Sequence, residues 1–392
     1  MEASSAHRIN PGRRQGEQVS PLELFFDLVF VLAITQCTQL MADNPTWEGI
    51  AQGLLVLALL WWSWAAYAWL TSVLDPDDGV VRAVIFVSMG ALLICSICVP
   101  GAFDDLGLWF VLGYGVVRFA HIGLFVIASR DEPDLRRSVI GIAAGTALGI
   151  GLLAFGTAFD GWAQWGIWLF ALVLDVGETF LFGAGGWQLQ PAHFAERHGL
   201  IVLIALGESI VAIGVGAEVS LDWGIAGAAA AGVLLTAAMW WIYFDIVSIV
   251  AGRRLVRAPV GREQNEMARD SYSYIHYVMV AGIILAALGL KKTIAGVDDP
   301  LKTVPAFALL GGVAFYLLGH VAFRLRHHKG LNRQRLGIAV ALLAAVPLAT
   351  EVPALVVLVA VALVLWVMIG FETRSYGEGR TQLRAEFARG ES

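Results

Sequence analysis

The sequence predicts an all-α fold, a polytopic bundle of about twelve transmembrane helices. Of its 392 residues, 58% are hydrophobic and only 15% are charged, whereas an average soluble protein has roughly 25% charged residues. The apolar residues gather in runs of about 20, long enough to span about 30 Å of hydrocarbon. This composition excludes a soluble enzyme and a disordered scaffold, and the net charge of −6 gives no basic surface for nucleic acid.

Twelve apolar stretches follow a polar N-terminal segment (1–21) that lacks the apolar core of a cleavable signal peptide. Between the last two stretches only the turn Thr350-Glu351-Val352-Pro353 remains, so one long re-entrant hairpin is an alternative to two spans there. A polar tail (371–392) ends the chain. The predicted spans are 22–42, 49–72, 81–101, 107–128, 138–159, 163–184, 198–218, 223–250, 272–290, 303–323, 335–350 and 353–370.

Basic residues predict that both termini are cytoplasmic, because loops rich in Lys and Arg stay on that side of a membrane. With the N-terminus inside, 22 of the 26 Lys and Arg residues fall in cytoplasmic segments. The outside loops then hold only Lys291, Lys292 and Lys302. A count that is wrong by one helix would break this alternation, so the charges favour twelve spans.

The two halves of the chain, 22–184 and 185–370, resemble each other weakly. FDLVFVLAITQC (26–37) aligns with HGLIVLIALGES (198–209), and each opens a run of six predicted helices. Six is an even number, so the halves share one orientation, as in transporters built from parallel repeats. Chance similarity between apolar helices is the alternative to this duplication.

We single out ten ionisable side chains within the predicted spans, where a charge costs at least about 2.5 kcal/mol at the centre. None lies in the outer half, so we expect a polar cavity that opens to the cytoplasm where the two halves meet. For Glu23 and His320, which lie close to a cytoplasmic helix end, we expect interfacial or interhelical contacts instead. The ten residues are Glu23, Asp27, Arg118, His121, Asp175, Glu178, Glu208, Asp245, His276 and His320.

Two patterns indicate how such a cavity is lined. Helix 22–42 carries a polar stripe at helical spacing, composed of Glu23, Asp27, Thr35, Thr38 and Gln39. Two later helices carry matching triplets, Gly177-Glu178-Thr179 and Gly207-Glu208-Ser209. The triplets predict a pair of facing acidic sites, with a polar clamp between helices as the alternative.

Other polar groups carry no chemistry that we can identify. Cys37, Cys95 and Cys98 all lie in apolar runs, which predicts packing rather than a disulfide or a zinc site. The segment His193-Phe-Ala-Glu196-Arg-His198 lacks the spacing of a zinc-protease helix. We therefore assign no catalytic residue, no metal ligand and no cofactor.

Two segments resemble the bacterial low temperature requirement A (LtrA) family. They are VSPLELFFDLVFVLAITQ (19–36) and HFAERHGLIVLIALGESIVAIG (193–214). The resemblance implies a multi-pass protein of the bacterial cytoplasmic membrane that is linked by name to growth in the cold, and it transfers no biochemical activity. The residues that carry it are Glu23, Asp27, Glu196, Arg197, His198, Glu208 and Ser209.

These observations favour a proton- or ion-coupled solute transporter, embedded in lipid, rather than an enzyme. We expect Arg118 to be a counter-ion or an anion anchor, and His121 and His276 to titrate in the cavity. Because carboxylates outnumber this one cation, a cationic solute or a proton is favoured over an anion. The expected binding groups are Asp27, Asp175, Glu178, Glu208 with Ser209, and Asp245.

Three alternatives remain. An ion channel is one, because FFDLVFVLAIT also resembles the first-helix motif of a potassium-channel family, although Phe26 replaces its serine and Gly199 its second aspartate. A membrane-embedded enzyme and a membrane sensor are the others. The sequence identifies neither the solute nor the oligomeric state.

Overall fold

The structure is a computed structural model that describes residue 14 and residues 18–182, 189–216, 222–328 and 330–375. Within these residues it is helical, and an isolated antiparallel bridge joins Pro300 and Pro353. The all-α prediction is confirmed. Most of the two predicted polar tails, 1–21 and 371–392, lies outside the described residues.

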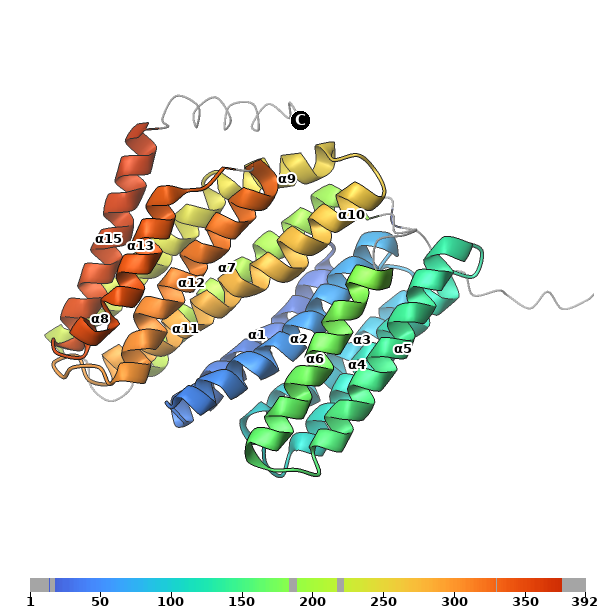
Figure 1. Cartoon of the computed structure of the whole chain (residues 1–392), viewed down its shortest axis with the longest axis horizontal. Helices are drawn as coiled ribbons and strands as arrows, with labels where there is room; N and C mark the ends of the chain where they lie inside the picture. The colour runs from blue at the N-terminus through green and yellow to red at the C-terminus, as the bar shows by residue number, and fades with distance from the viewer. Residues whose placement is uncertain (1–13, 15–17, 183–188, 217–221, 329, 376–392) are drawn as a thin grey trace, which may run out of the picture. The chain divides into compact units, whose positions relative to one another are not determined.

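Eleven helical segments among the described residues are long and apolar enough to cross a membrane, which indicates a multi-pass membrane protein. Figure 1 shows their order along the chain. They are α1 (Pro21–Asp43), α2 (Trp47–Val73), α3 (Gly79–Cys98) with η1 (Val99–Gly101), α4 (Gly107–Ala128), α5 (Pro133–Gly156), α6 (Gly161–Phe182), α7 (Pro191–Gly216), α8 (Trp223–Phe244) with α9 (Val247–Arg257), α10 (Arg262–Ala268) with η2 (Arg269–Ile275) and α11 (His276–Ile294), α12 (Thr303–His328) and α15 (Ala354–Ser375).

The predicted span 335–350 is not one continuous helix, and eleven segments of the described residues meet the length criterion rather than twelve. It forms α13 (Arg333–Ala344) and the four-residue α14 (Val346–Ala349). Pro347 has no N–H for an intrahelical hydrogen bond and restricts the backbone before it, which accounts for the interruption at Ala345.

The start of α15 nevertheless lies beside the loop that precedes α12. The backbone N–H groups of Ala354 and Leu355 donate to the carbonyl oxygens of Asp299 and Val297, both at 3.0 Å. The chain from α12 through α13 and α14 therefore runs to the far end of α12 and back.

The chain forms two compact units. Unit 1 comprises Met1–Ala33, Ala58–Phe194 and Pro259–Glu266, and unit 2 comprises Ile34–Leu57, Ala195–Ala258 and Met267–Ser392. Helices α1 and α2 each contribute residues to both units, and each unit is described by itself below.

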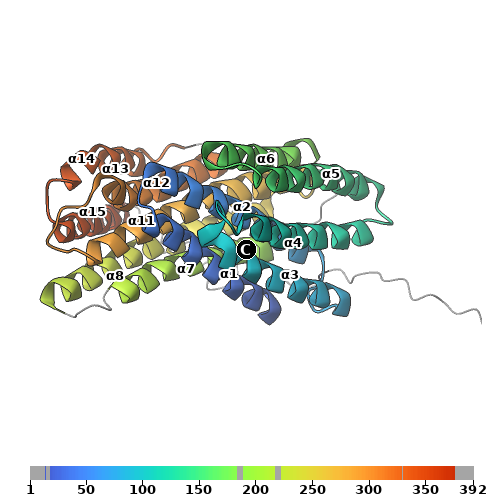
Figure 2. The same cartoon turned by 90° about the horizontal axis from the view of Figure 1, so that it is seen from below.

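In unit 1, α5 and α6 lie side by side in both views (Figures 1 and 2). Trp168 of α6 is fully buried, donates from its indole Nε1 to the carbonyl oxygen of Leu153 at 3.0 Å, and stacks on Phe110 of α4 with the ring centroids 5.5 Å apart. This tryptophan therefore fixes α6 against both α5 and α4. These three helices carry the candidate site.

In unit 2, α11 and α12 approach closely because small residues face each other. A methyl carbon at Gly282 would lie 2.5 Å from the backbone nitrogen of Tyr316, and one at Gly289 would lie 2.5 Å from Leu309 Cα. Such small residues allow backbones to touch, which is typical of helix pairs in membranes.

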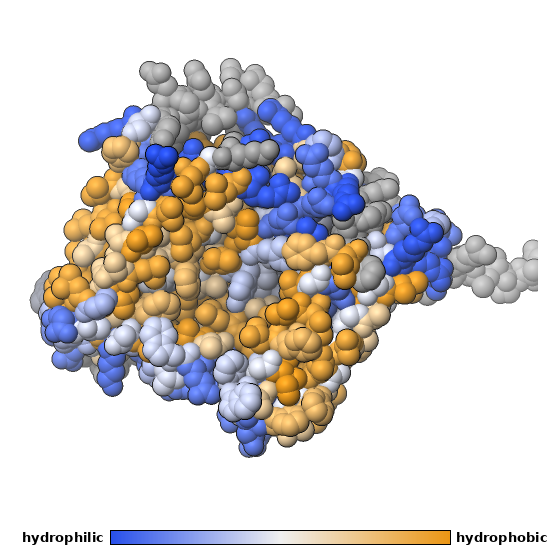
Figure 3. Space-filling view, in the orientation of Figure 1, coloured by the Kyte–Doolittle hydropathy of each residue, from blue (hydrophilic) through white to orange (hydrophobic). Residues whose placement is uncertain are grey.

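The outer flank of unit 2 is apolar. Side chains of α15 such as Val356, Leu363, Val367 and Phe371 are more than half exposed, and Figure 3 shows hydrophobic residues across the flank formed by α13 and α15. Such a surface is unfavourable in water and suits contact with lipid tails.

Candidate functional site

Arg118 and Asp175 form a buried ion pair in unit 1. Arg118 lies halfway along α4, and its Nη2 donates to both oxygens of Asp175 on α6, at 2.8 and 3.0 Å. Both side chains are at least nine-tenths buried. The opposite charge offsets the cost of burying each group.

Thr146 of α5 joins this pair to a second carboxyl group. Its hydroxyl accepts a hydrogen bond from Arg118 Nη2 at 2.8 Å and donates to Asp175 Oδ1 at 2.7 Å. The same hydroxyl lies 3.4 Å from Glu178 Oε1, one turn along α6 from Asp175. Three helices thus bring one cation and two carboxyl groups to one hydroxyl.

The sequence of α5 makes room for Glu178. A methyl carbon at Gly145 would lie 1.4 Å from Glu178 Oε2, so every side chain other than hydrogen would overlap the carboxyl group. Gly145 precedes Thr146 directly, and the pair presents an open backbone and a hydroxyl to α6. The dipeptide therefore forms the α5 side of the site.

Sequence reasoning identified Arg118, Asp175 and Glu178, and the structure brings these three together. It missed Thr146 and also Tyr114 of α4, whose hydroxyl lies 3.5 Å from Asp175 Oδ2. Both are neutral residues in apolar helices, so the cost of burying charge did not point to them.

His121, which was also predicted as a site residue, is one turn beyond Arg118. Its ring lies near the rings of Tyr67 and Phe125, with centroid distances of 5.7 and 5.0 Å.

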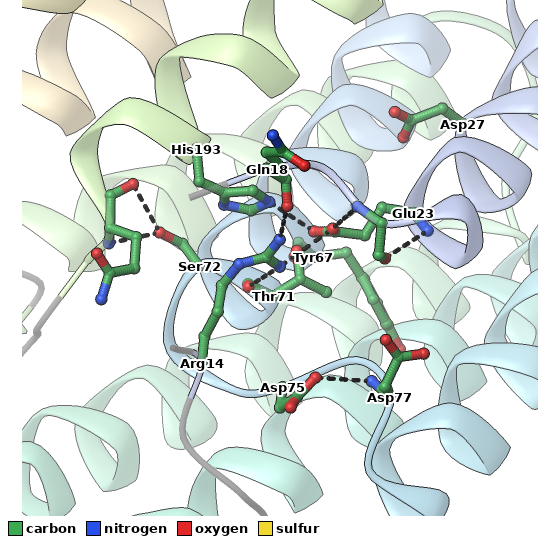
Figure 4. Close-up of polar contacts among 12 residues, drawn as sticks. Arg14, Gln18, Glu23, Asp27, Tyr67, Thr71, Ser72, Asp75, Asp77 and His193 are labelled. Atoms are coloured by element: carbon green, nitrogen blue, oxygen red, sulfur yellow. Dashed lines mark hydrogen bonds and ion pairs between the residues drawn. The ribbon is translucent and has the colours of Figure 1, made fainter. Parts of the chain in front are cut away.

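Two acidic residues of α1 have partners within unit 1. Asp27 is fully buried and accepts a hydrogen bond from Trp64 Nε1 at 2.8 Å. Glu23 begins a larger network (Figure 4): its Oε2 accepts from Arg14 Nη1 at 3.1 Å and from the Ser20 backbone N–H at 2.8 Å, and its Oε1 lies 2.8 Å from His193 Nε2.

The Glu23 network is a structural anchor. The Ser20 hydroxyl in turn accepts from the Glu23 backbone N–H at 3.3 Å, so Ser20 and Glu23 form a capping box at the start of α1. Arg14 also donates to the carbonyl oxygens of Thr71 and Gln18. These contacts agree with the expected interhelical role of Glu23, and the Ser-x-x-Glu spacing was a signal for the cap in the sequence.

Unit 2 contains a second acidic group, Glu208 of α7, which is buried. It accepts a hydrogen bond from the Thr35 hydroxyl of α1 at 2.6 Å, and its neighbour Ser209 is buried beside it. One turn from Thr35, Gln39 Oε1 accepts from Lys291 Nζ of α11 at 2.6 Å. The predicted polar stripe of α1 therefore makes interhelical contacts at Thr35 and Gln39.

His276 lies in a buried cluster of aromatic rings in unit 2. Its Nδ1 is 2.8 Å from the carbonyl oxygen of Ser271 and its Nε2 is 2.8 Å from the Tyr243 hydroxyl. A carbonyl only accepts, so Nδ1 carries the proton and Nε2 accepts from Tyr243. The rings of His198 and Tyr272 lie 5.4 and 4.9 Å from the His276 ring.

A π-helix immediately precedes His276. Residues Arg269–Ile275 (η2) form this uncommon element, which in other proteins occurs frequently at functional sites. The remaining predicted residues lie elsewhere in unit 2: Asp245 is buried at the end of α8, and Arg197 is fully buried on α7, whereas its neighbour Glu196 is exposed. Within the described part of the chain, no three His, Cys, Asp or Glu side chains are arranged to hold a metal ion.

Comparison with known proteins identifies the chain's relatives. The family model described as bacterial low temperature requirement A protein (LtrA) matches residues 18–370. An uncharacterised protein of Rhizobium meliloti (strain 1021) is 29% identical over 307 residues, which are 75% of this chain and 74% of that protein. No solved structure matches the chain. The family match spans the whole candidate site.

Proposed function

The chain belongs to the bacterial low temperature requirement A family, and we propose that it is a solute transporter driven by protons or another ion. The observation that carries this proposal is the buried network of Arg118, Asp175, Thr146 and Glu178 on α4, α5 and α6. Ionisable groups inside membrane helices are costly and typically mark ion or substrate pathways.

The charges of this network favour a cationic ligand. Arg118 offsets one carboxylate, and the second carboxyl group is then free to bind a proton or a cation. Glu208 with Thr35 supplies a further acidic group in unit 2. We propose Asp27 and Asp245 as additional cation-binding groups, with Ser209 assisting Glu208 and with His121 and His276 titrating during the cycle.

We further propose twelve membrane crossings with both termini in the cytoplasm, in the inner membrane of a bacterium. The return of α15 to the end from which α12 departs supports a full crossing by α13 and α14 together. The distribution of Lys and Arg supports the orientation. A parallel repeat of six helices, with a polar cavity open to the cytoplasm, completes this proposal.

Reconstitution in liposomes tests the function directly. Purified protein is exposed to a panel of organic cations, neutral solutes and anions under an imposed proton or sodium gradient, and charge movement is recorded at two pH values. We expect gradient-driven uptake of a cationic solute. The double variant Glu178→Gln/Glu208→Gln should insert normally but lose the pH dependence of uptake.

The matched control is Asp134→Asn, which removes a carboxylate from an exposed ion pair at the start of α5 and should transport as the unmodified protein does. Uptake by the double variant with an unchanged pH profile would contradict the assigned roles. Single-channel currents would indicate a channel instead, and chemical turnover without net flux would indicate an enzyme.

A further inference from the structure

We infer that the coupling ion is the proton and that Glu178 carries it. This inference rests on the function proposed above and adds the identity of the ion and of the atom that binds it. It follows from the way in which the hydrogen-bond donors of the site are distributed between the two carboxyl groups.

Asp175 receives nearly all of these donors. One oxygen accepts from Arg118 Nη2 and from the Thr146 hydroxyl, and the other accepts from the same guanidinium nitrogen and faces the Tyr114 hydroxyl at 3.5 Å. Every one of these contacts stabilises the ionised form of a carboxyl group. The hydrogen-bond donors of the site therefore converge on Asp175.

Glu178 receives almost none of the hydrogen-bond donors of the site. The Thr146 hydroxyl has one proton, which it donates to the nearer Asp175 oxygen at 2.7 Å, so the contact of 3.4 Å to Glu178 Oε1 lacks a donor. Glu178 Oε2 has no hydrogen-bond partner within the described residues, although the side chain is more than nine-tenths buried. An ionised carboxylate would be unsatisfied in this position.

A proton resolves this deficit. Adding one proton to Glu178 removes its negative charge and supplies an O–H donor, and the remaining charges of Arg118 and Asp175 cancel. Among the described residues, the charged groups that face Glu178 are Arg118 from α4 and Asp175 from α6, while α5 contributes the uncharged Thr146 and Gly145. Release of the proton leaves one net negative charge at the site. A cationic solute can neutralise this charge in place of the proton.

A metal cation fits the same position less well. Hard cations bind through several oxygen ligands at once. The oxygens of Asp175 and Thr146 already accept hydrogen bonds from Arg118, which would repel a cation from them. Of Asp175, Thr146 and Glu178, only Glu178 has oxygens that accept no hydrogen bond from Arg118, and two oxygens are enough for a proton but not for a metal shell.

Infrared spectroscopy of the purified full-length protein tests this inference without requiring transport. A buried protonated carboxyl group gives its own carbonyl band, which we expect to disappear on titration to alkaline pH. Incorporation of ¹³C-glutamate should shift this band in the unmodified protein, which assigns it to Glu rather than Asp. Glu178→Gln should lose the band, whereas Glu208→Gln should retain it.

Two results would overturn the inference. One is a pH titration in which no glutamate carbonyl band of the unmodified protein is lost in Glu178→Gln. The other is a band whose titration midpoint falls as sodium chloride replaces choline chloride, because sodium would then compete for the same oxygens. An unchanged midpoint in sodium supports the proton.

Gly145 provides an independent variant that keeps the carboxyl group. Gly145→Ala places a methyl carbon 1.4 Å from the position of Glu178 Oε2, so the carboxyl group must move and the band should shift in frequency. Gly151→Ala on the same helix meets nothing within 4 Å and should leave the band unchanged. Equal spectra for the two variants would contradict the position of Glu178. If the band is present but liposomes show no uptake, the transporter proposal fails while the proton site stands.

Discussion

Arg118 shows how one buried charge constrains the residues around it. Its guanidinium group lies halfway along a membrane-spanning helix, and its described contacts from Nη2 are to Asp175 and Thr146. Removing one partner of a buried pair leaves the other charge uncompensated, which costs about 3–5 kcal/mol. The pair is therefore a sensitive point for stability.

Asp175→Asn should lower the free energy of unfolding by about 3–5 kcal/mol, because the change leaves Arg118 buried without a counter-charge. Unfolding titrations in mixed micelles measure this loss. Asp134→Asn, in a pair with side chains more than 80% exposed, should change stability by less than about 0.5 kcal/mol. The double variant Arg118→Gln/Asp175→Asn should recover part of the loss, and strict additivity would show that the two residues do not interact.

Tyr243 and His276 form a neutral pair that can be tested in the same way. Tyr243→Phe removes the hydroxyl that donates to His276 Nε2 and leaves a buried acceptor unsatisfied, at a cost of about 1–3 kcal/mol. Thermal unfolding should therefore begin at a lower temperature. Stability equal to that of the unmodified protein would indicate that the two rings only pack against each other.

At the scale of whole elements, α5 carries the clearest test of packing. Gly145→Ala should destabilise the protein by about 1 kcal/mol, because the Glu178 carboxyl group must move away from the added methyl group. Gly151→Ala should instead stabilise it by up to about 1 kcal/mol, because alanine favours a helix and the site is open. Adding Glu178→Ala to Gly145→Ala should restore most of the loss, and a loss that persists would place the clash elsewhere.

Helix positions could be predicted from the sequence because span length and hydropathy are local properties. The expected span 22–42 corresponds to α1 at Pro21–Asp43. The interruption at Ala345 was not predicted, because Pro347 lies inside a stretch that is apolar throughout. The π-helix η2 has no compositional signal, and its seven residues were expected to begin or precede an ordinary span.

Partners were harder to predict than elements. The cost of burying charge indicated that Arg118 needs a carboxylate, and similar depth in the membrane favoured Glu208, directly or through Asp175. The fold selects Asp175, 57 residues away, whereas Glu208 accepts a hydrogen bond from Thr35. Neutral partners such as Thr146 and Tyr114 give no such signal. Sequence alone therefore identified the ionisable members of the site and not the hydroxyls that contact them.

At the scale of the whole molecule, membrane topology is the property on which the other proposals depend. Three cysteines are native to the chain, and Cys37, Cys95 and Cys98 are all buried, so they should not react with a charged thiol reagent that cannot cross membranes. Single cysteines can therefore be added without removing them. Exposed loop positions give the clearest signal.

Four substitutions should separate the two sides of the membrane. Lys302→Cys and Glu351→Cys should react in intact cells, because both lie in the loops that meet between α11, α12 and α15. Val260→Cys, at a residue that is 89% exposed, and Arg374→Cys should react only in inverted vesicles. Val260 is preferable to Gly261, whose backbone φ of 107° disfavours any other side chain. Reaction of Val260→Cys from outside would overturn the topology. Reaction at residue 302 without reaction at residue 351 would favour a re-entrant hairpin over a full crossing by α13 and α14.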